Sequence, residues 1–120
     1  MVEYGENGEI ISSGSYINGE KEGEWNYFSG DHIEKGKYII GLREGVWNYF
    51  YLNNVTHFEG KYVRGLAQGK HVFYYPDGTI KEERYYELGI RERNWKKYDE
   101  LGNLKMIITY KNDKEYRING

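Results

Sequence analysis

The chain has 120 residues, enough for one domain of ordinary size, with 14 Tyr, 16 Gly, one Pro and no Cys. The absence of Cys excludes disulfides, and no stretch approaches the roughly 20 apolar residues that a membrane helix requires. Aromatic residues favour strands and frequent Gly marks turns, so the composition argues against a core of aliphatic side chains. Charged residues make up 30% of the chain and alternate with aromatic ones, which argues against disorder.

The net charge of −2 is divided unevenly. Residues 1–60 contain 4 Lys and Arg against 10 Asp and Glu, a net charge of −6, whereas residues 61–120 contain 13 against 9, a net charge of +4. This polarity could orient a partner, or the charges could simply solvate strand faces. The first ten residues, MVEYGENGEI, are acidic and lack the apolar run of a signal peptide, so we expect a cytoplasmic protein.

The sequence repeats with a period of about 24 residues, which indicates a repeat architecture. A partial unit at 4–13 is followed by units that begin at Gly14, Gly36, Gly60, Arg84 and, for a last partial unit, Ile108. We number each unit from its first residue as position zero, and we expect a single repeat domain over residues 1–120. The recurring residues are Tyr at position two (Tyr16, Tyr38, Tyr62, Tyr86, Tyr110), Gly at position five (Gly19, Gly41, Gly65, Gly89), Gly at position nine (Gly23, Gly45, Gly69) and a ring at position eleven (Trp25, Trp47, His71, Trp95).

Each unit predicts two strands joined by tight turns. Around the start of the fourth unit, residues 78–88 form an extended run, 89–93 a turn, 94–100 a return strand, and 100–103 the turn into the next unit. Loops of this length join antiparallel neighbours, and no segment shows the 3.6-residue apolar period of a helix. We therefore expect about nine to ten antiparallel strands and essentially no helix.

Alternation along a strand assigns the side chains to two faces. In the return strand of the second unit, Trp47 and Tyr49 point one way and Phe50 the other. The Tyr at position two is predicted to share the Trp face, so that the Tyr and Trp columns stack along the sheet and form the core. The Gly positions suit tight turns or close packing of a ring over the backbone, where a Cβ would intrude.

The repeated pattern G-x-Y-x-x-G-x-x-x-G-x-W-x-[YF]-[YF], followed by an N/D-G turn, resembles the bacterial variant of the MORN repeat. The resemblance covers about residues 4–110 and is carried by GSYINGEKEGEWNYF (14–28), GKYIIGLREGVWNYF (36–50) and GKHVFYYPDG (69–78). It implies an all-β fold, an elongated antiparallel β-meander of repeated hairpins. Departures from the pattern are Arg93 and Arg117 in place of Gly and His71 in place of Trp.

No arrangement of residues predicts catalysis. The three His residues, His32, His57 and His71, have no metal-site spacing, and His71 is expected to be a structural substitute in the Trp column. Adjacent carboxylates such as Glu82 and Glu83 point to opposite faces, no Ser has a G-x-S-x-G context, and no phosphate-binding loop occurs. We expect no enzyme activity, no metal and no cofactor.

The leading functional hypothesis is a non-catalytic protein-binding scaffold, because Tyr, Trp and Arg often carry interface energy. The resemblance includes proteins described as antitoxin- or immunity-like, so neutralisation of a protein toxin is its sharpest form. The predicted surface consists of the rings at position fourteen and a basic group, although these rings could instead pack on the second face of the sheet: Phe28, Phe50, Tyr74 and Tyr98, with Arg91, Arg93, Lys96 and Lys97.

Other ligand classes receive less support from the sequence. Nucleic acid is not expected, because the basic and aromatic stretch at 91–98 is diluted by Glu residues. MORN-type repeats are often suggested to bind membrane lipid, but the basic cluster is shorter and more interrupted than lipid surfaces require. Aromatic-rich β-repeats can also bind carbohydrate or choline-like ligands of the cell wall. The sequence leaves open whether the terminal strands pair between chains.

Overall fold

The computed structural model describes residues 2–4 and 10–116. Residues 5–9 of the predicted first partial unit, and Arg117 in the last, lie outside the described residues. The described residues form a twelve-stranded sheet. Its strands are β1 (Val2–Tyr4), β2 (Ile10–Ile17), β3 (Glu20–Ser29), β4 (His32–Ile39), β5 (Leu42–Tyr51), β6 (Thr56–Val63), β7 (Leu66–Tyr74), β8 (Ile80–Glu87), β9 (Ile90–Arg91), β10 (Arg93–Tyr98), β11 (Leu104–Lys111) and β12 (Lys114–Tyr116).

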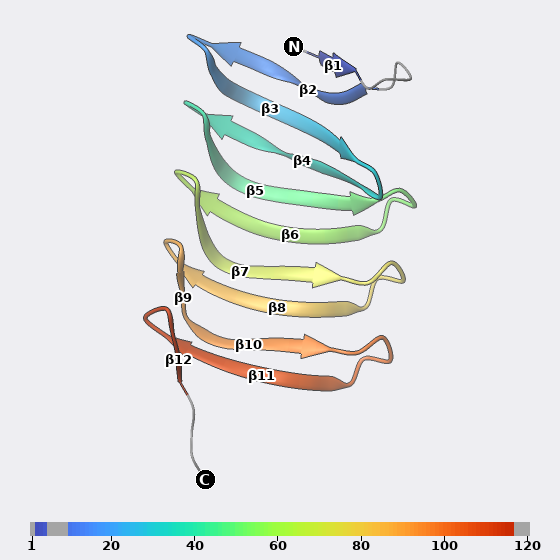
Figure 1. The fold of residues 1–120 in the computed structure, drawn as a ribbon, viewed down its shortest axis with the longest axis vertical. Helices are drawn as coiled ribbons and strands as arrows, with labels where there is room; N and C mark the ends of the chain where they lie inside the picture. The colour runs from blue at the N-terminus through green and yellow to red at the C-terminus, as the bar shows by residue number, and fades with distance from the viewer. Residues whose placement is uncertain (1, 5–9, 117–120) are drawn as a thin grey trace.

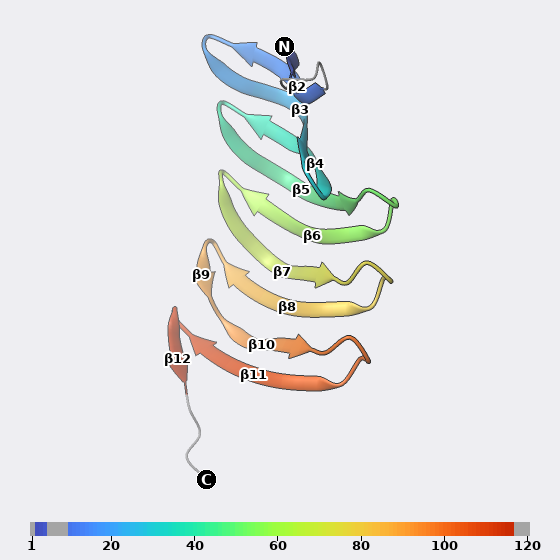
Figure 2. The same cartoon turned by 45° about the vertical axis from the view of Figure 1, so that its right-hand side comes forward.

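The strands follow one another through a single open antiparallel sheet (Figure 1). Each pairs with its neighbour in the chain, except that β8 pairs with both β9 and β10. The sheet measures 56 × 32 × 20 Å and remains one stack of hairpins when turned (Figure 2). The predicted all-β, elongated meander is therefore confirmed. The described residues contain no helix, and so none that could cross a membrane.

Two kinds of strand alternate. We call β2, β4, β6, β8 and β11 the Tyr strands, since each carries the Tyr of position two, and β3, β5, β7 and β9–β10 the Trp strands, since each carries the ring of position eleven. The strand number exceeds the expected nine to ten for two reasons. Short strands lie at both ends, and the fourth Trp strand is interrupted at Glu92.

The turn at positions four and five sets the geometry between units. Both residues have positive φ, as in Ile40 (50°) and Gly41 (76°), which matches the primed turns that suit twisted hairpins. The Gly41 amide donates to the Lys21 carbonyl of the preceding unit at 2.9 Å, and three later units repeat this bond. Each hairpin end is thereby tied to the hairpin before it.

A polar side chain at position eight adds a second tie that the sequence analysis missed. Glu22 accepts a hydrogen bond from the Ile40 amide at 2.8 Å, and the same contact recurs at each later unit junction. These side chains satisfy turn amides that the sheet ladder does not reach. This second tie could have been predicted from the sequence, because position eight always carries a carboxylate or an amide in the four full units: Glu22, Glu44, Gln68 and Glu92.

In the first two full units the core is built on Trp rings that lie over glycines, Trp25 over Gly14 and Trp47 over Gly36. Trp47 is completely buried and pairs across the strands with Gly60, while its ring covers Gly36 on the other side; a Cβ on Gly36 would lie 2.0 Å from the ring. The indole Nε1 donates to the Lys37 carbonyl at 3.1 Å, and Trp25 and Trp95 make the equivalent bond. The predicted ring-over-backbone packing at position zero is confirmed.

The Tyr column stacks with the Trp column, but it is less buried than predicted. Tyr38 stands edge-on between Trp25 and Trp47, at centroid distances of 6.1 and 5.1 Å, and is buried. Tyr62, Tyr86 and Tyr110 are half-buried, and Tyr16 is 41% exposed. Of the Tyr column that was predicted to form the core, only Tyr38 is therefore buried, with Tyr62 packed against the core. A single sheet has no second layer to cover the outer edges of these rings.

His71 takes the place of Trp, as predicted. It is buried, and its Nε2 lies 2.8 Å from the Lys61 carbonyl, the same bond that each indole makes. Phe58 fills the space that the smaller ring leaves, with a centroid distance of 5.3 Å. The equivalent positions carry Ser12, Glu34, Glu82 and Met106, so Phe58 and His71 compensate each other across the paired strands β6 and β7.

The ring-over-glycine contact gives a first prediction. Gly36→Ala should lower the free energy of unfolding by about 3 kcal/mol, because the new Cβ would collide with the Trp47 ring. Urea denaturation of Gly36→Ala, Trp47→Leu and the double variant measures the coupling. In the Trp47→Leu background the alanine should cost far less. Additive effects of the two substitutions would contradict this account of the core.

The turn gives a second prediction. Ile40 is a β-branched residue with φ of 50°, whereas Asn18 and Asn112 occupy the same position in other units. Ile40→Asn should raise the free energy of unfolding by about 1 kcal/mol, since Asn tolerates the left-handed region better. Ile39→Asn is the matched control, because Ile39 is also exposed but lies within a strand. If Ile40→Asn does not stabilise the chain, or if Ile39→Asn stabilises it equally, the turn at Ile40 is not strained.

Candidate functional site

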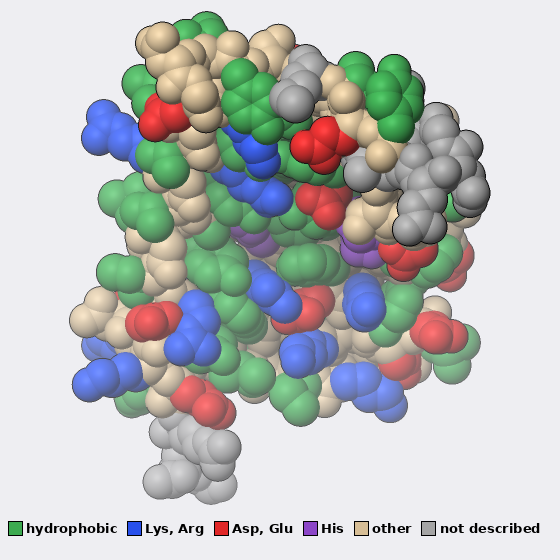
Figure 3. Space-filling view, turned by 45° about the horizontal axis from the view of Figure 1, so that its top comes forward, with side chains coloured by type: hydrophobic (Ala, Val, Ile, Leu, Met, Phe, Trp, Pro, Cys, Tyr) green, Lys and Arg blue, Asp and Glu red, His purple; other side chains and the backbone are tan. Residues whose placement is uncertain are grey.

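The face that carries Trp25, Trp47, His71 and Trp95, here called the Trp face, is the candidate binding surface. Across it runs a row of directly paired residues, Tyr27, Glu34, Tyr49, Phe58, Phe73, Glu82 and Lys97. Figure 3 shows hydrophobic side chains over the middle of one side of the sheet, with charged side chains of both signs among them. The surface is thus aromatic and charged at once.

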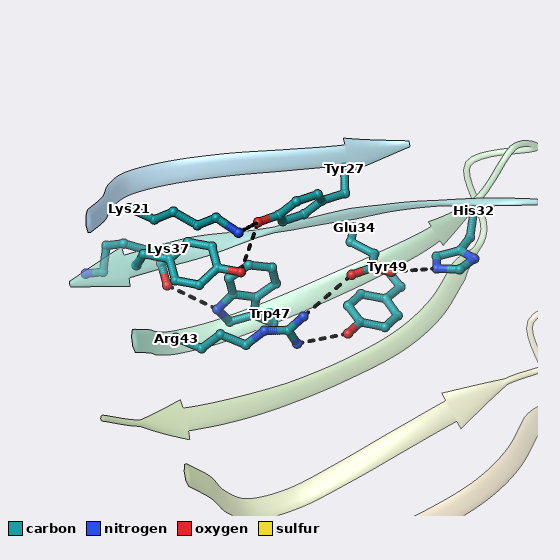
Figure 4. A network of polar contacts seen from close by, with 9 residues as sticks. Lys21, Tyr27, His32, Glu34, Lys37, Arg43, Trp47 and Tyr49 are labelled. Atoms are coloured by element: carbon teal, nitrogen blue, oxygen red, sulfur yellow. Dashed lines mark hydrogen bonds and ion pairs between the residues drawn. The ribbon is translucent and has the colours of Figure 1, made fainter. Parts of the chain in front are cut away.

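Lys21 begins the polar network on this face (Figure 4). Its Nζ donates to the Tyr27 hydroxyl at 2.7 Å, and the Tyr27 and Tyr38 hydroxyls are 3.1 Å apart. The ammonium also lies 5.2 Å from the centroid of the Trp25 ring. The hydrogen bond to Tyr27 raises the pKa of Lys21, and burial raises the pKa of Tyr27. The amine therefore stays charged and the phenol protonated, in fixed positions.

Arg43 makes the equivalent contacts in the following unit. Its guanidinium lies 4.1 Å from the centroid of the Trp47 ring, donates to the Tyr49 hydroxyl at 2.9 Å, and approaches Glu34 at 3.6 Å. Burial opposes its charge most strongly, but the contacts with Tyr49, Tyr62 and Tyr38 together outweigh burial, so the pKa of Arg43 lies above its ordinary value. A cation stacked on a partly desolvated indole contributes a cation–π attraction that also fixes its orientation.

The cations recur at position seven, a column that the sequence analysis did not single out. Lys21, Arg43 and Arg91 each lie over rings of the Tyr and Trp columns, and Arg91 is 4.5 Å from the centroid of Tyr110. The third unit has Ala67 at this position, and there Arg84 lies 4.5 Å from Phe73 instead. A basic residue that recurs two places before the glycine of position nine could have revealed this column in the sequence.

His32 and His57 stack on each other at the end of the polar network, next to Glu34. The rings of His32 and His57 are 4.9 Å apart, and the His32 nitrogens contact Asp31 and Glu34 at 2.8 and 2.9 Å. The buried Nδ1 of His57 has no hydrogen-bond partner among the described residues. No group of three or more His, Cys, Asp or Glu residues in the described part of the chain is arranged to hold a metal ion.

Two hollows open on the Trp face. The first has a volume of about 430 Å³ and is lined by Tyr27, Tyr38, Arg43 and Glu34, together with Glu3, Ser12, Phe28 and Ser29. The second, of about 290 Å³, is lined by Tyr51, His57, Phe73, Tyr74, Lys81, Glu82 and Arg84. Each hollow contains an arginine, a glutamate and several rings. Between the two hollows, Tyr49 packs on Phe58 and, at a longer distance, on His57.

The rings predicted at position fourteen lie along one end of the Trp strands. Phe28 is 43% exposed and borders the first hollow, and Tyr74 borders the second. Phe50 is half-buried, with the Lys35 ammonium 5.9 Å from its centroid. Tyr98 is half-buried, and its hydroxyl donates to Glu83 at 3.4 Å. Phe28 and Tyr74 therefore lie beside the Trp-face hollows.

The predicted basic group does not form one cluster. Lys96 and Lys97 pair with Glu83 and Glu82, and as strand neighbours they point to opposite faces. Arg93 stacks on Tyr85, 4.0 Å from its centroid, and lines a hollow of the opposite face with Lys96. Arg91 is held by Asp113 at 2.7 Å. Of the four, only Arg91 and Lys97 accompany the Trp face.

Comparison with known families identifies the repeat. Two segments, residues 67–88 and 94–112, match the family described as MORN repeat variant. Each comprises most of a Trp strand and the Tyr strand that follows it, so the match covers two successive structural units. The curated proteins contain no match to the chain. The resemblance inferred from the glycine and aromatic columns is confirmed for these two segments.

Two histidines of the Trp face, His71 and His32, should make the stability of the fold depend on pH in opposite directions. Burial, with Arg84 nearby, lowers the pKa of His71 below 6.5, so the unfolded chain takes up this proton more readily and stability falls as the pH drops below about 6.5. Burial also disfavours protonated His32, but its bonds to Asp31 and Glu34 raise its pKa above 6.5. Its contribution is therefore present at low pH and lost as the pH rises through the folded-state value.

Urea denaturation between pH 5 and pH 8 separates these contributions. His71→Gln should lose less stability on acidification than the unsubstituted chain, and His32→Gln should lose more. An identical pH profile for the two variants would show that these side chains do not titrate as their surroundings indicate.

Proposed function

We propose that the chain is a non-catalytic, protein-binding repeat scaffold that contacts its partner through the Trp face. MORN repeats generally serve as binding and scaffold modules, which supports the class of function. The observation that carries the proposal is the arrangement of Arg43 with Trp47, Tyr49 and Glu34 beside the first hollow, repeated by Arg84 with Phe73 and Glu82 beside the second.

These side chains are ordered before any partner arrives. Arg43 is held by three groups of its own sheet, and Arg84 donates to Glu82 at 2.8 Å while lying 5.2 Å from the Trp95 centroid. Ordering a long side chain on binding costs roughly 0.5–1.5 kcal/mol, and this cost has already been met in the free chain. Arg and Tyr are also the residues that most often dominate interfaces.

The sharpest form of the proposal is neutralisation of a protein toxin by masking its surface. It is supported by the resemblance to antitoxin- and immunity-like repeat proteins. A preformed surface of rings and charges, with no movement required, suits an inhibitor that acts by covering. The division of charge between the two halves would orient a partner with the reverse polarity.

An affinity experiment tests the face and the function together. The tagged chain serves as bait in lysate of its source organism, and any captured protein is then purified and its affinity measured. Arg43→Gln with Arg84→Gln should weaken binding by about 30-fold or more, as expected for two interface anchors. The matched control is Lys61→Ala with Lys70→Ala, two exposed lysines on the opposite face, which should bind normally. Circular dichroism confirms that each variant is folded.

A further variant separates the Trp face from the rings at position fourteen. Phe50→Ala with Tyr74→Ala removes one half-buried ring on the opposite face and one beside the second hollow. Loss of binding in this variant but not in the arginine variant would move the site from Arg43 and Arg84 to the rings at position fourteen. A change in Trp fluorescence on adding glycans, or flotation with anionic liposomes, without any protein partner, would overturn the proposed function.

A further inference from the structure

The turns along one side of the sheet form a row of exposed side chains. We call the turns that join each Tyr strand to the Trp strand after it the near turns. They lie one above another (Figures 1 and 2), at residues 17–20, 39–42, 63–66, 87–90 and 111–114. Hydrophobic side chains follow this left-hand edge in Figure 3. In the three middle near turns, six of them are 41–67% exposed: Ile39, Ile40, Leu42, Leu66, Leu88 and Ile90.

The apolar row continues from one near turn to the next. Leu42 lies against the turn that follows it, since a Cβ added to Gly65 would be 3.3 Å from the Leu42 Cδ2 atom. Leu66 meets Gly89 in the same way. Soluble monomers rarely expose a long contiguous apolar surface, and such a surface usually marks an interaction site. The near turns therefore have the character of an interface.

This row does not belong to the Trp face. Tyr38 pairs with Arg43 on the Trp face, and the adjacent pair, Ile39 with Leu42, points to the opposite face. A partner bound along the near turns leaves the Trp face open. Binding at the near turns is therefore independent of the proposed function.

The near turns read almost the same from either end of the row. Position six carries, in chain order, Glu20, Leu42, Leu66, Ile90 and Lys114. Position four carries Asn18, Ile40, Arg64, Leu88 and Asn112. Both columns have apolar residues in second and fourth place and polar residues of one kind at the ends, except that position six ends in a carboxylate and an ammonium. A surface with this pattern is complementary to itself when it is turned end for end.

We propose that the near turns bind a second copy of this chain, antiparallel to the first, about a two-fold axis at the third turn. Leu66 would then meet Leu66 of the second copy, and Leu42 would meet Ile90 of the second copy. Glu20 would meet Lys114 at both ends of the row. Neighbouring strands of a sheet are evenly spaced, about 4.8 Å apart, so the turns of the two copies stay in step. Each copy contributes the same patch, as a two-fold interface requires.

The charges of the outermost near turns favour the antiparallel orientation. Lys111 and Lys114 pair directly across the last turn, and like charges in that position repel. The carboxylate of this turn, Asp113, is bonded to Arg91 at 2.7 Å. The last turn therefore attracts a further carboxylate, which the exposed Glu20 of the second copy would supply. A parallel arrangement would instead bring two lysine pairs together.

The division of charge along the chain favours the same orientation. Residues 1–60 carry −6 and residues 61–120 carry +4, so an antiparallel pair places each half against a half of opposite sign. At the axis the two Arg64 side chains would approach each other. Each is accompanied by Glu44 of its own chain, whose carboxylate accepts a bond from the Arg64 amide at 2.8 Å. This carboxylate reduces the repulsion at the axis.

Sedimentation velocity of the full chain tests the pairing. The unsubstituted chain should convert from monomer to dimer as its concentration rises and form nothing larger, because a two-fold interface is closed. Leu66→Glu brings two carboxylates together at the axis and should weaken the dimer by about 10-fold or more. The matched control is Val46→Glu, because Val46 is 51% exposed on the same face but lies within β5, outside the near turns.

Reversal of the end charges gives the decisive measurement. Glu20→Lys alone and Lys114→Glu alone should each weaken the dimer by about 10-fold or more, since each places like charges at both ends of the row. The double variant restores opposite charges and should dimerise like the unsubstituted chain. An equal mixture of the two single variants should also form a dimer with one copy of each, because one variant is positive at both places and the other is negative.

Three results would overturn the proposal. The first is an unsubstituted chain that stays monomeric at every concentration, or that forms a growing series of larger oligomers. The second is a dimer that Leu66→Glu weakens no more than Val46→Glu does. The third is a double variant as weak as the single variants, or single variants as strong as the unsubstituted chain, because Glu20 and Lys114 would then not meet. Circular dichroism spectra matching the unsubstituted chain establish that the variants fold.

Discussion

The packing of a flat aromatic ring on bare backbone is the contact on which this structure depends. A single sheet has no second layer to bury its side chains, and yet Trp47 is wholly buried. Burial is possible because Gly36 and Gly60 flank the indole and let it lie down on the strands, with its N–H bonded to a carbonyl of the Tyr strand. The sheet and its own aromatic residues thus supply both layers of the core.

Everything on the Trp face follows from that arrangement. With the indoles lying flat, the Tyr of position two stands edge-on between them, and the cation of position seven reaches over both rings. The charged groups remain near water while their stems and neighbours are buried, as is usual for long amphipathic side chains. The surface offered to a partner is therefore also the outer layer of the core, so binding energy and folding energy share the same residues.

Much of the fold could be predicted from the sequence because the same contact is repeated. Columns of Gly, Tyr and Trp at fixed spacing determined the hairpins, the turns and the stacking of rings. The sequence did not predict how far each side chain of the Tyr column is buried. Alternation places Tyr16 and Tyr38 on one face, but only the neighbours in space show that Tyr38 has a Trp on each side and Tyr16 does not.

The candidate site was harder to predict, for a related reason. Residues adjacent in the sequence, such as Lys96 and Lys97, suggest a basic cluster, but neighbouring side chains of a strand point to opposite faces. The residues that do meet, such as Arg43, Tyr49 and Glu34, come from neighbouring strands and are brought together by register. A comparison of position seven across units would have found the cations.

The bonds between turns also have a direction. At each described junction the turn amides at positions four and five donate to acceptors of the earlier unit, 18 to 22 residues before them. A nascent chain leaving the ribosome would therefore find the acceptors for these turn amides already in place. Each of these turns can thus close on the turn before it while the chain is still being made.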